Sequence, residues 1–141
     1  MDFKDFIREE IIRKASIDKS LSKSLLKNSI EDLKFLDKLG IDKSSSRKLM
    51  TNYYDVLRSI LEAISSIRGY KIYSHEAFTS FLKELEEEAL SRKFDRFRKI
   101  RNSINYYGKD ISVEETRENI KEIKNMIHIL IKKYLRGLEN D

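Results

Sequence analysis

The absence of proline and the positions of the four glycines constrain the fold of this sequence more than any other feature. Proline breaks helix interiors, so a chain of 141 residues without it can form long uninterrupted helices. Each glycine follows an apolar pattern of helical period, where glycine enters the left-handed conformation that ends many helices. The four are Gly40, Gly69, Gly108 and Gly137. This pattern predicts helices joined by short turns.

Polar residues that cap helices stand before several of the apolar patterns. Asp18, Ser44 and Ser74 are candidate N-caps, and the Ser-Val-Glu-Glu run over 112–115 is a candidate capping box. No segment shows the sustained alternation of apolar and polar residues that indicates a strand. The expected helices cover 2–15, 18–39, 44–68, 74–90, 91–107 and 112–136.

The longest expected helices are amphipathic, as bundle helices are. The helix over 44–68 gathers its large apolar residues on one side, and these are Leu49, Tyr53, Val56, Leu57, Ile60, Ile64 and Ile67. Short connections between long helices make consecutive helices antiparallel. We therefore predict an all-α fold, an antiparallel up-down bundle of four main helices plus short extra helices, formed by one domain over residues 1–141.

Composition narrows the classes of function. Charged residues make up 38% of the chain, against about a quarter in an average soluble protein, so most helix faces must meet solvent. The net charge of +5 permits an anionic partner without requiring one. The lack of cysteine excludes disulfides, thiolate metal sites and cysteine nucleophiles.

Targeting and cofactor signals are missing from the sequence. No apolar run reaches transmembrane length, and the first five residues lack the basic-then-apolar pattern of a signal peptide, so we expect a cytoplasmic protein without a membrane partner. Two histidines far apart, with no carboxylates at ligand spacing, favour no metal site. No glycine-rich phosphate loop is present, and we expect no cofactor.

The helix over 91–107 carries the strongest candidate site. Arg98, Arg101 and Asn105 share one face, and Arg101 lies at the border of an apolar side. We expect that side to be buried and to consist of Phe94, Phe97, Ile100, Ile104 and Tyr107. A guanidinium group restrained at a core edge can present its planar fork to a phosphate group. Alternatively, Arg101 pairs with Asp55 or Glu62 and only ties two helices together.

A lysine stripe on the helix over 18–39 is a second candidate for binding nucleic acid. Its members share a narrow sector at 3.6 residues per turn, and they are Lys23, Lys27, Lys34 and Lys38. Such a stripe can follow a phosphate backbone. The simpler interpretation, a solvated polar face, is favoured because Glu31 and Asp37 lie beside the stripe.

Several of these motifs, in this order, resemble the HEPN family of small helical proteins. The resemblance covers about residues 44–136 and rests on four segments, 52–58 (Asn-Tyr-Tyr-Asp-Val-Leu-Arg), Gly69-Tyr70, 74–78 (Ser-His-Glu-Ala-Phe) and 94–108. HEPN ribonucleases carry an Arg-x-x-x-x-His motif at a helix end. Arg101 matches the arginine of that motif, Asn102 matches the polar residue that often follows it, and Tyr106 occupies the histidine position.

The resemblance implies a phosphate-binding role for Arg101 but leaves the chemistry open. RNA cleavage through the 2′-hydroxyl needs a base and an acid near neutral pH, and an ordinary tyrosine with a pKa near 10 is only about a thousandth ionised at pH 7. His75, at the start of a short helix, fits packing or local capping better than catalysis. His128 borders an apolar stripe.

The leading hypothesis is therefore a HEPN-like module associated with nucleic acid or nucleotides, with a degenerate active-site motif. The resemblance implies a homodimer, and it implies a toxin-like role beside a small nucleotidyltransferase partner. One alternative is an active, metal-independent endoribonuclease that uses Arg101 with Tyr106 or His75. The other is a structural helical adaptor without enzymatic activity.

Overall fold

A computed structural model describes residues 1–138 of the chain, and it is mostly helical over that range. In chain order its elements are α1 (Phe3–Arg8), β1 (Ile12–Lys14), α2 (Lys19–Leu36), α3 (Ser46–Ile67), β2 (Tyr70–Ile72), α4 (His75–Glu84), α5 (Glu88–Tyr107) and α6 (Val113–Tyr134). The expectation of an all-α helical bundle is confirmed.

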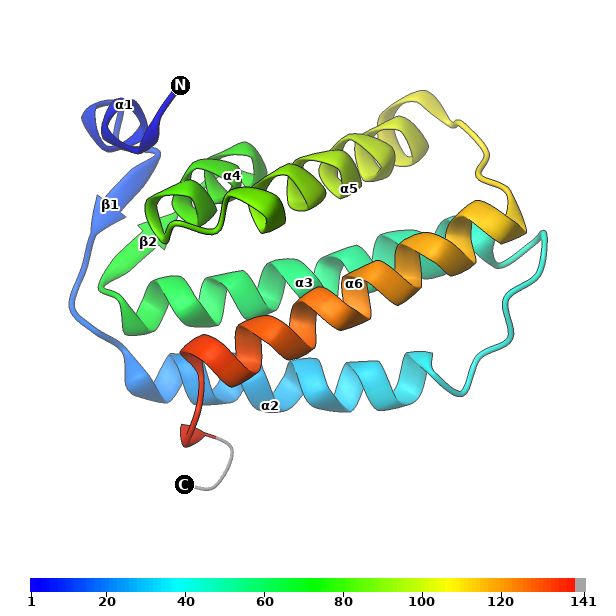
Figure 1. The fold of residues 1–141 in the computed structure, drawn as a ribbon, viewed down its shortest axis with the longest axis horizontal. Coiled ribbons are helices and arrows are strands. Elements are labelled where there is room, and N and C mark those ends of the chain that lie inside the picture. Colours follow the sequence, from blue (N-terminus) through cyan, green and yellow to red (C-terminus); the bar gives the residue numbers. More distant parts are fainter. Residues whose placement is uncertain (139–141) are drawn as a thin grey trace.

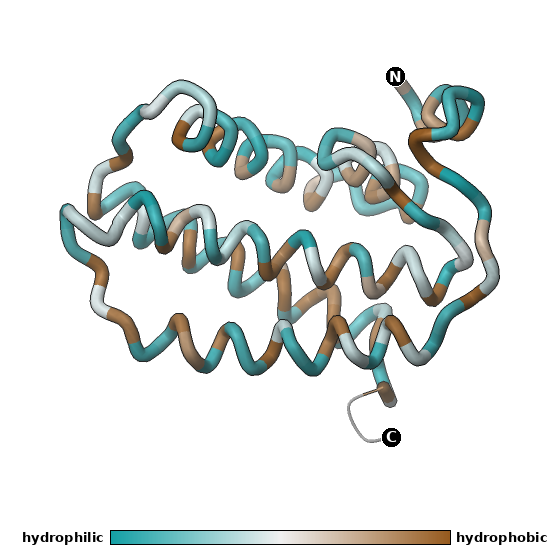
Figure 2. Tube along the Cα trace, turned by 180° about the vertical axis from the view of Figure 1, so that it is seen from behind, coloured by the Kyte–Doolittle hydropathy of each residue, from teal (hydrophilic) through white to brown (hydrophobic). Residues whose placement is uncertain are grey.

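The four long helices run alternately up and down, and α3 lies at the centre (Figure 1). Helices α2 and α6 pack against α3, α5 crosses it on another side, and α4 packs mainly against α5. Apolar positions recur with helical period along each long helix (Figure 2). The core consequently centres on α3, which buries Met50, Leu57, Ile60, Leu61 and Ile64 completely.

The expected first helix over 2–15 is wrong beyond Arg8. Glu10 has a left-handed backbone with φ of 61°, which breaks the helix. Ile12 is then fully buried as part of β1, which pairs antiparallel with β2 so that Ile12 stands opposite Ile72. Pairing between segments sixty residues apart has no local sequence signature. The resulting two-stranded ribbon ties the start of the chain to the end of α3.

Most expected helix ends are confirmed, and the start of the third helix is corrected. The side chains of Asp18, Ser74 and Ser112 each accept a backbone N–H three residues on. Helix α3 begins at Ser46 rather than near Ser44, because the Asp42 side chain accepts the backbone N–H groups of Ser44 and Ser45 and holds them in a turn.

Gly108 caps α5 in the left-handed conformation, as expected. Gly69 and Gly137 also have positive φ, whereas Gly40 does not, so Gly40 is not a left-handed helix stop.

The boundary between the fourth and fifth helices lies earlier than expected. Helix α4 ends at Glu84, and α5 begins at Glu88 rather than near residue 91. Between them Glu86 has φ of 63°. The Glu87 side chain is only 10% exposed and accepts a hydrogen bond from Lys133 Nζ at 2.5 Å, which fixes this turn against α6. Within residues 1–138, no helix has both the length and the apolarity needed to cross a membrane.

Candidate functional site

Two antiparallel rows of side chains face each other where α5 crosses α3, and we call this the α3–α5 seam. Each row has members at i, i+4, i+7 and i+11, so each occupies one side of its helix. The α3 row consists of Arg47, Thr51, Tyr54 and Arg58, and the α5 row of Phe94, Arg98, Arg101 and Asn105. The seam therefore concentrates four arginines between two helices.

Tyr54 is the packing centre of the seam. It is fully buried, and its ring stacks on Phe94 with 5.5 Å between ring centroids. The guanidinium carbon of Arg101 lies 5.8 Å from the centre of the Tyr54 ring, within the range of a cation–π contact. The aromatic packing thus restrains the position of the Arg101 guanidinium group.

His75 joins the seam from the first turn of α4. Ser74 caps that helix, and the Tyr54 hydroxyl oxygen lies 3.0 Å from Nδ1 of His75. Burial, and then the positive charges of Arg58, Arg101 and Arg98, lower the pKa of His75 to about 4. Burial also raises the pKa of the Tyr54 hydroxyl. Near pH 7 the seam therefore holds a neutral imidazole hydrogen-bonded to a neutral phenol.

Arg101 has only neutral partners. Its Nη1 donates to Asn102 Oδ1 at 3.2 Å and to the Tyr106 hydroxyl at 3.3 Å, while its Nε is buried without a partner. Among residues 1–138, no carboxylate lies within ion-pair distance of Arg101. The alternative in which Arg101 pairs with Asp55 or Glu62 is therefore not what the structure shows, and Glu62 pairs with Arg58 instead.

The other two arginines near His75 are partly neutralised. Arg98 donates to Asp95 Oδ1 from Nη2 at 2.8 Å and from Nε at 3.2 Å. Arg58 pairs with Glu62, and Nε of Arg58 is buried without a partner. Three guanidinium groups lie around the Tyr54–His75 pair, together with the carboxylates of Asp95, Glu62 and Asp55, the last of which interacts electrostatically with Tyr54 and Arg101. Arg101 nevertheless forms no ion pair among residues 1–138, and a guanidinium group in that state suits an anionic ligand.

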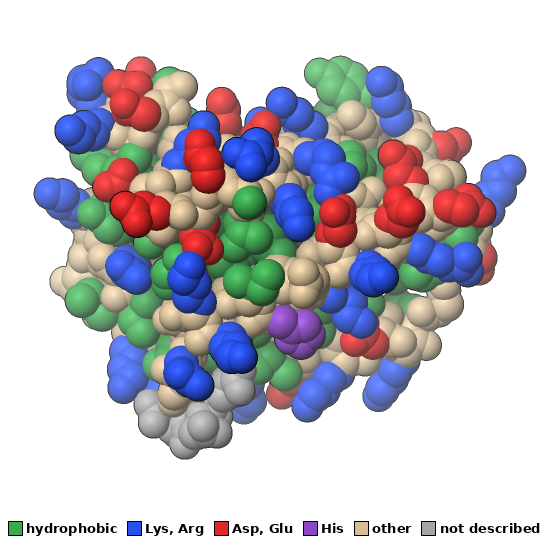
Figure 3. All heavy atoms as spheres, in the orientation of Figure 1, with side chains coloured by type: hydrophobic (Ala, Val, Ile, Leu, Met, Phe, Trp, Pro, Cys, Tyr) green, Lys and Arg blue, Asp and Glu red, His purple; other side chains and the backbone are tan. Residues whose placement is uncertain are grey.

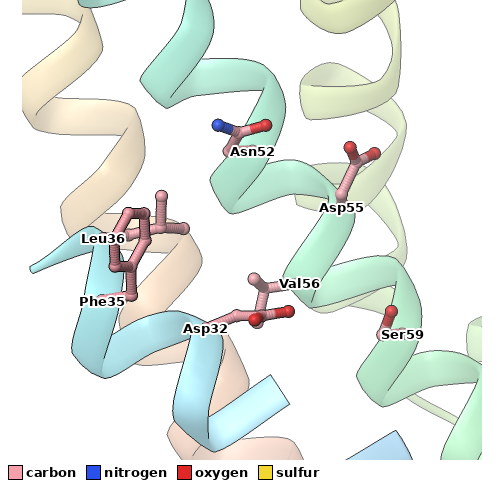
Figure 4. Close-up of a pocket in the computed structure, with 7 residues that line it drawn as sticks. All are labelled: Asp32, Phe35, Leu36, Asn52, Asp55, Val56 and Ser59. Atoms are coloured by element: carbon pink, nitrogen blue, oxygen red, sulfur yellow. The ribbon is translucent and has the colours of Figure 1, made fainter. Parts of the chain in front are cut away.

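Two other hollows beside the bundle suit anions less well. The hollow between α2 and α3 carries Asp32 and Asp55, and Phe35 beside it is 62% exposed (Figure 4). A larger groove of about 1,020 Å³ separates α5 from α6 and is bridged by the Arg96–Glu122 ion pair. Acidic and basic side chains are interspersed over that face (Figure 3). Neither hollow concentrates positive charge as the seam does.

The structure brings most of the sequence-predicted site together and separates the rest. On α5 at the seam, Arg98, Arg101 and Asn102 are partly buried, and Asn105 and Tyr106 are exposed. The lysine stripe lies elsewhere, since α2 packs on α3 away from α5 (Figure 1). Three of its members line a separate hollow with Glu31 and Leu138, and these are Lys23, Lys27 and Lys34.

The structure differs from the sequence-based expectation in two ways. One is the exposure of a residue at the end of α5, and the other is the presence of two further residues in the seam. Phe94 and Phe97 are buried as expected, but Tyr107 is 77% exposed, because the helix end extends beyond the core. Sequence reasoning did not single out Tyr54 or Arg58 as site residues. Their signal was present, since Arg47, Tyr54 and Arg58 repeat at seven and eleven residues along α3.

Comparison of this chain with protein-family models, curated proteins and solved structures finds no match. The HEPN resemblance accordingly rests on the motifs alone.

Proposed function

We propose that the α3–α5 seam binds the phosphate groups of single-stranded RNA and that the protein is a HEPN-like RNA-binding module. The observation that carries this proposal is the Arg101 guanidinium group. Tyr54 and Tyr106 restrain it, and no carboxylate among residues 1–138 forms an ion pair with it. A restrained arginine with free donor capacity matches the geometry of a phosphate group.

Two exposed aromatic rings support a single strand as the ligand. Tyr106 and Tyr107 end α5 next to Arg101, and they are 68% and 77% exposed. Exposed aromatic side chains beside a basic groove stack unpaired bases, at about 1–3 kcal/mol per base. A duplex keeps its bases paired and stacked and would leave these rings unused. Phosphate contacts at Arg101 and base stacking on the tyrosines together describe a single-strand site.

Fluorescence anisotropy with a labelled single-stranded RNA tests the proposal. Wild-type protein should bind with an affinity that falls as salt rises, because phosphate contacts release counterions. Arg101→Gln should weaken binding by about 5–150-fold, corresponding to roughly 1–3 kcal/mol for a charge-assisted contact. Arg117→Gln is the matched control, since Arg117 is an exposed arginine of α6 away from the seam. Equal binding by all three proteins would show that Arg101 does not contact the RNA, and no salt-dependent binding by the wild type would favour the structural-adaptor alternative.

One observation favours a second candidate function, a metal-independent endoribonuclease. His75 lies on the Arg101 side of Tyr54 with an imidazole that is neutral near pH 7, although its pKa of about 4 makes it a weaker base than an ordinary histidine. In this mechanism His75 takes the proton of a 2′-hydroxyl, that oxygen attacks the adjacent phosphorus, and the 5′-oxygen of the next nucleotide leaves and takes up a proton from water. The products would be a 2′,3′-cyclic phosphate and a 5′-hydroxyl end. Their appearance with wild-type protein and chelator, and their loss in both His75→Gln and Arg101→Gln, would make this candidate the correct one.

The HEPN resemblance also supports two partners. One is a second copy of the chain, and the other is a small nucleotidyltransferase towards which this protein acts as the toxin-like member. Co-expression with a nucleotidyltransferase encoded beside this gene, followed by co-purification through a single tag, tests the second partner. A neighbouring gene of another kind would count against it.

A further inference from the structure

Another hollow, separate from those described above, lies in the α3–α5 seam at the end that is farther from His75. It has a volume of about 270 Å³ and is lined by Ser44, Arg47, Lys48, Thr51, Ile104 and Asn105. Known small-molecule sites have volumes of about 300–1,000 Å³, so this hollow suits a compact group such as one nucleotide. It combines two cations with hydroxyl groups, one amide and one apolar side chain.

The hollow continues the line of the Arg101 site. Asn105 follows Arg101 by one helical turn on the same side of α5, about 6 Å along the helix axis. On α3, Arg47 precedes Arg58 by eleven residues, which is close to three turns and about 16 Å. Since the two helices are antiparallel, both rows lead from the His75 end of the seam to this hollow. A strand bound at Arg101 therefore meets it next.

The side chains of the hollow are able to recognise a nucleotide. Arg47 has one ionic partner, Asp110, at 3.5 Å, and both side chains are exposed, at 54% and 92%. Exposed ion pairs are weak because solvent screens both charges, so a phosphate can displace Asp110. The Asn105 amide carries both donors and an acceptor, as a base edge does, and Ile104 offers an apolar surface.

We infer that this hollow is a nucleotide subsite, in which Arg47 binds a phosphate and Asn105 contacts the base that follows the Arg101-bound phosphate. The inference rests on the proposed function, because it places a second nucleotide of the same RNA. It predicts that RNA with several phosphates binds more tightly than RNA with one. It also predicts that Arg47 matters only for the longer ligand.

Binding of two RNA lengths to five proteins, Arg101→Gln among them, tests the subsite. A dinucleoside monophosphate has a single phosphate and occupies Arg101 alone, whereas an oligonucleotide of about eight residues lies within the site sizes of roughly 4–16 known for single-strand binders. Arg47→Gln and Asn105→Ala are compared with wild type and with Arg117→Gln. Both altered residues are exposed, and circular dichroism melting shows whether each variant keeps the wild-type fold.

Arg47→Gln should weaken binding of the longer RNA by about 5–30-fold and reduce its salt slope by about 0.7, the value for one phosphate of a single strand. Asn105→Ala should weaken the longer RNA without changing the salt slope. Both variants should bind the dinucleoside monophosphate as the wild type does.

Three results would overturn the subsite in distinguishable ways. If both variants bind the longer RNA normally while Arg101→Gln does not, the subsite is wrong and the proposed function stands. If Arg47→Gln weakens both lengths equally, Arg47 belongs to the Arg101 site rather than to a separate one. If the wild-type protein binds neither RNA, the proposed function and the subsite are both wrong.

Discussion

The Tyr54 hydroxyl oxygen lies 3.0 Å from Nδ1 of His75, and this contact joins α3 to the first turn of α4 beside Arg101. It places an imidazole near the arginine that we propose binds phosphate, even though the position five residues after Arg101 holds Tyr106. The Tyr54–His75 pair is also part of the aromatic core, since the Tyr54 ring stacks on Phe94.

His75 should make the stability of the protein fall as the pH drops below about 6.5. Its pKa is about 4 in the folded protein and about 6.5 in an unfolded chain, so between these values the unfolded state binds more protons. The stabilisation is complete above pH 6.5 and is lost as the pH falls towards 4. Urea unfolding at pH 7.5 and pH 5 should show a larger loss of unfolding free energy for wild type than for His75→Gln.

His128→Gln is the control for this comparison, because His128 is exposed on α6. It should keep the wild-type pH dependence. An equal loss of stability in wild type and His75→Gln would show that His75 does not remain neutral in the folded protein.

Tyr106→His should introduce metal-independent RNA cleavage. The Tyr106 hydroxyl lies 3.3 Å from Nη1 of Arg101, so a histidine at this exposed position would reach a phosphate bound there. An imidazole with an ordinary pKa near 6.5 exchanges protons at neutral pH, as general acid–base catalysis requires. Gel analysis of a labelled RNA should show cleavage by Tyr106→His and none by Arg101→Gln/Tyr106→His. No gain of cleavage would show that more than one catalytic group is missing from the seam.

The protein should form a homodimer at tens of micromolar, a concentration at which a complex with a Kd of about 1 μM is mostly assembled. The HEPN resemblance is the ground for this expectation. A symmetric interface containing Arg101 would bring two copies of the seam together. Sedimentation velocity measures the mass directly. A monomer of 16.8 kDa at these concentrations would contradict the expectation.

Gly69→Ala should lower the unfolding free energy by about 1–3 kcal/mol. Gly69 has φ of +82°, and a Cβ atom there would lie 3.1 Å from the backbone oxygen of Ala15. Ala15 N also donates to the Gly69 oxygen at 2.8 Å, so the chain cannot move apart without losing this bond. Gly40→Ala is the control, because nothing lies within 4 Å of the added Cβ atom and its φ is not positive. Equal denaturation midpoints for the two variants would contradict this account.

The helices, and the side chains that share a face of α5, were predictable from the sequence. Both depend only on residues that are close together along the chain. Side chains three and four residues apart share a helix face whatever the helix packs against. Arg98, Arg101 and Asn105 therefore lie on one side of α5, as expected. The caps at Asp18, Ser74 and Ser112 are equally local, since each side chain bonds a backbone group three residues away.

Only the tertiary structure decided which helix faces meet. The separation of Tyr54 from His75 is 21 residues, and that of Ile12 from Ile72 is sixty, so no periodicity within one segment could reveal either pair. The same limit explains why the expected first helix ends early, since burial of Ile12 against a distant strand outweighs local helix propensity. Packing of α5 on α3 likewise leaves Arg101 without a carboxylate at ion-pair distance among residues 1–138. The sequence by itself determined the helices and the residues each one displays, while long-range packing decided which of those residues form a site.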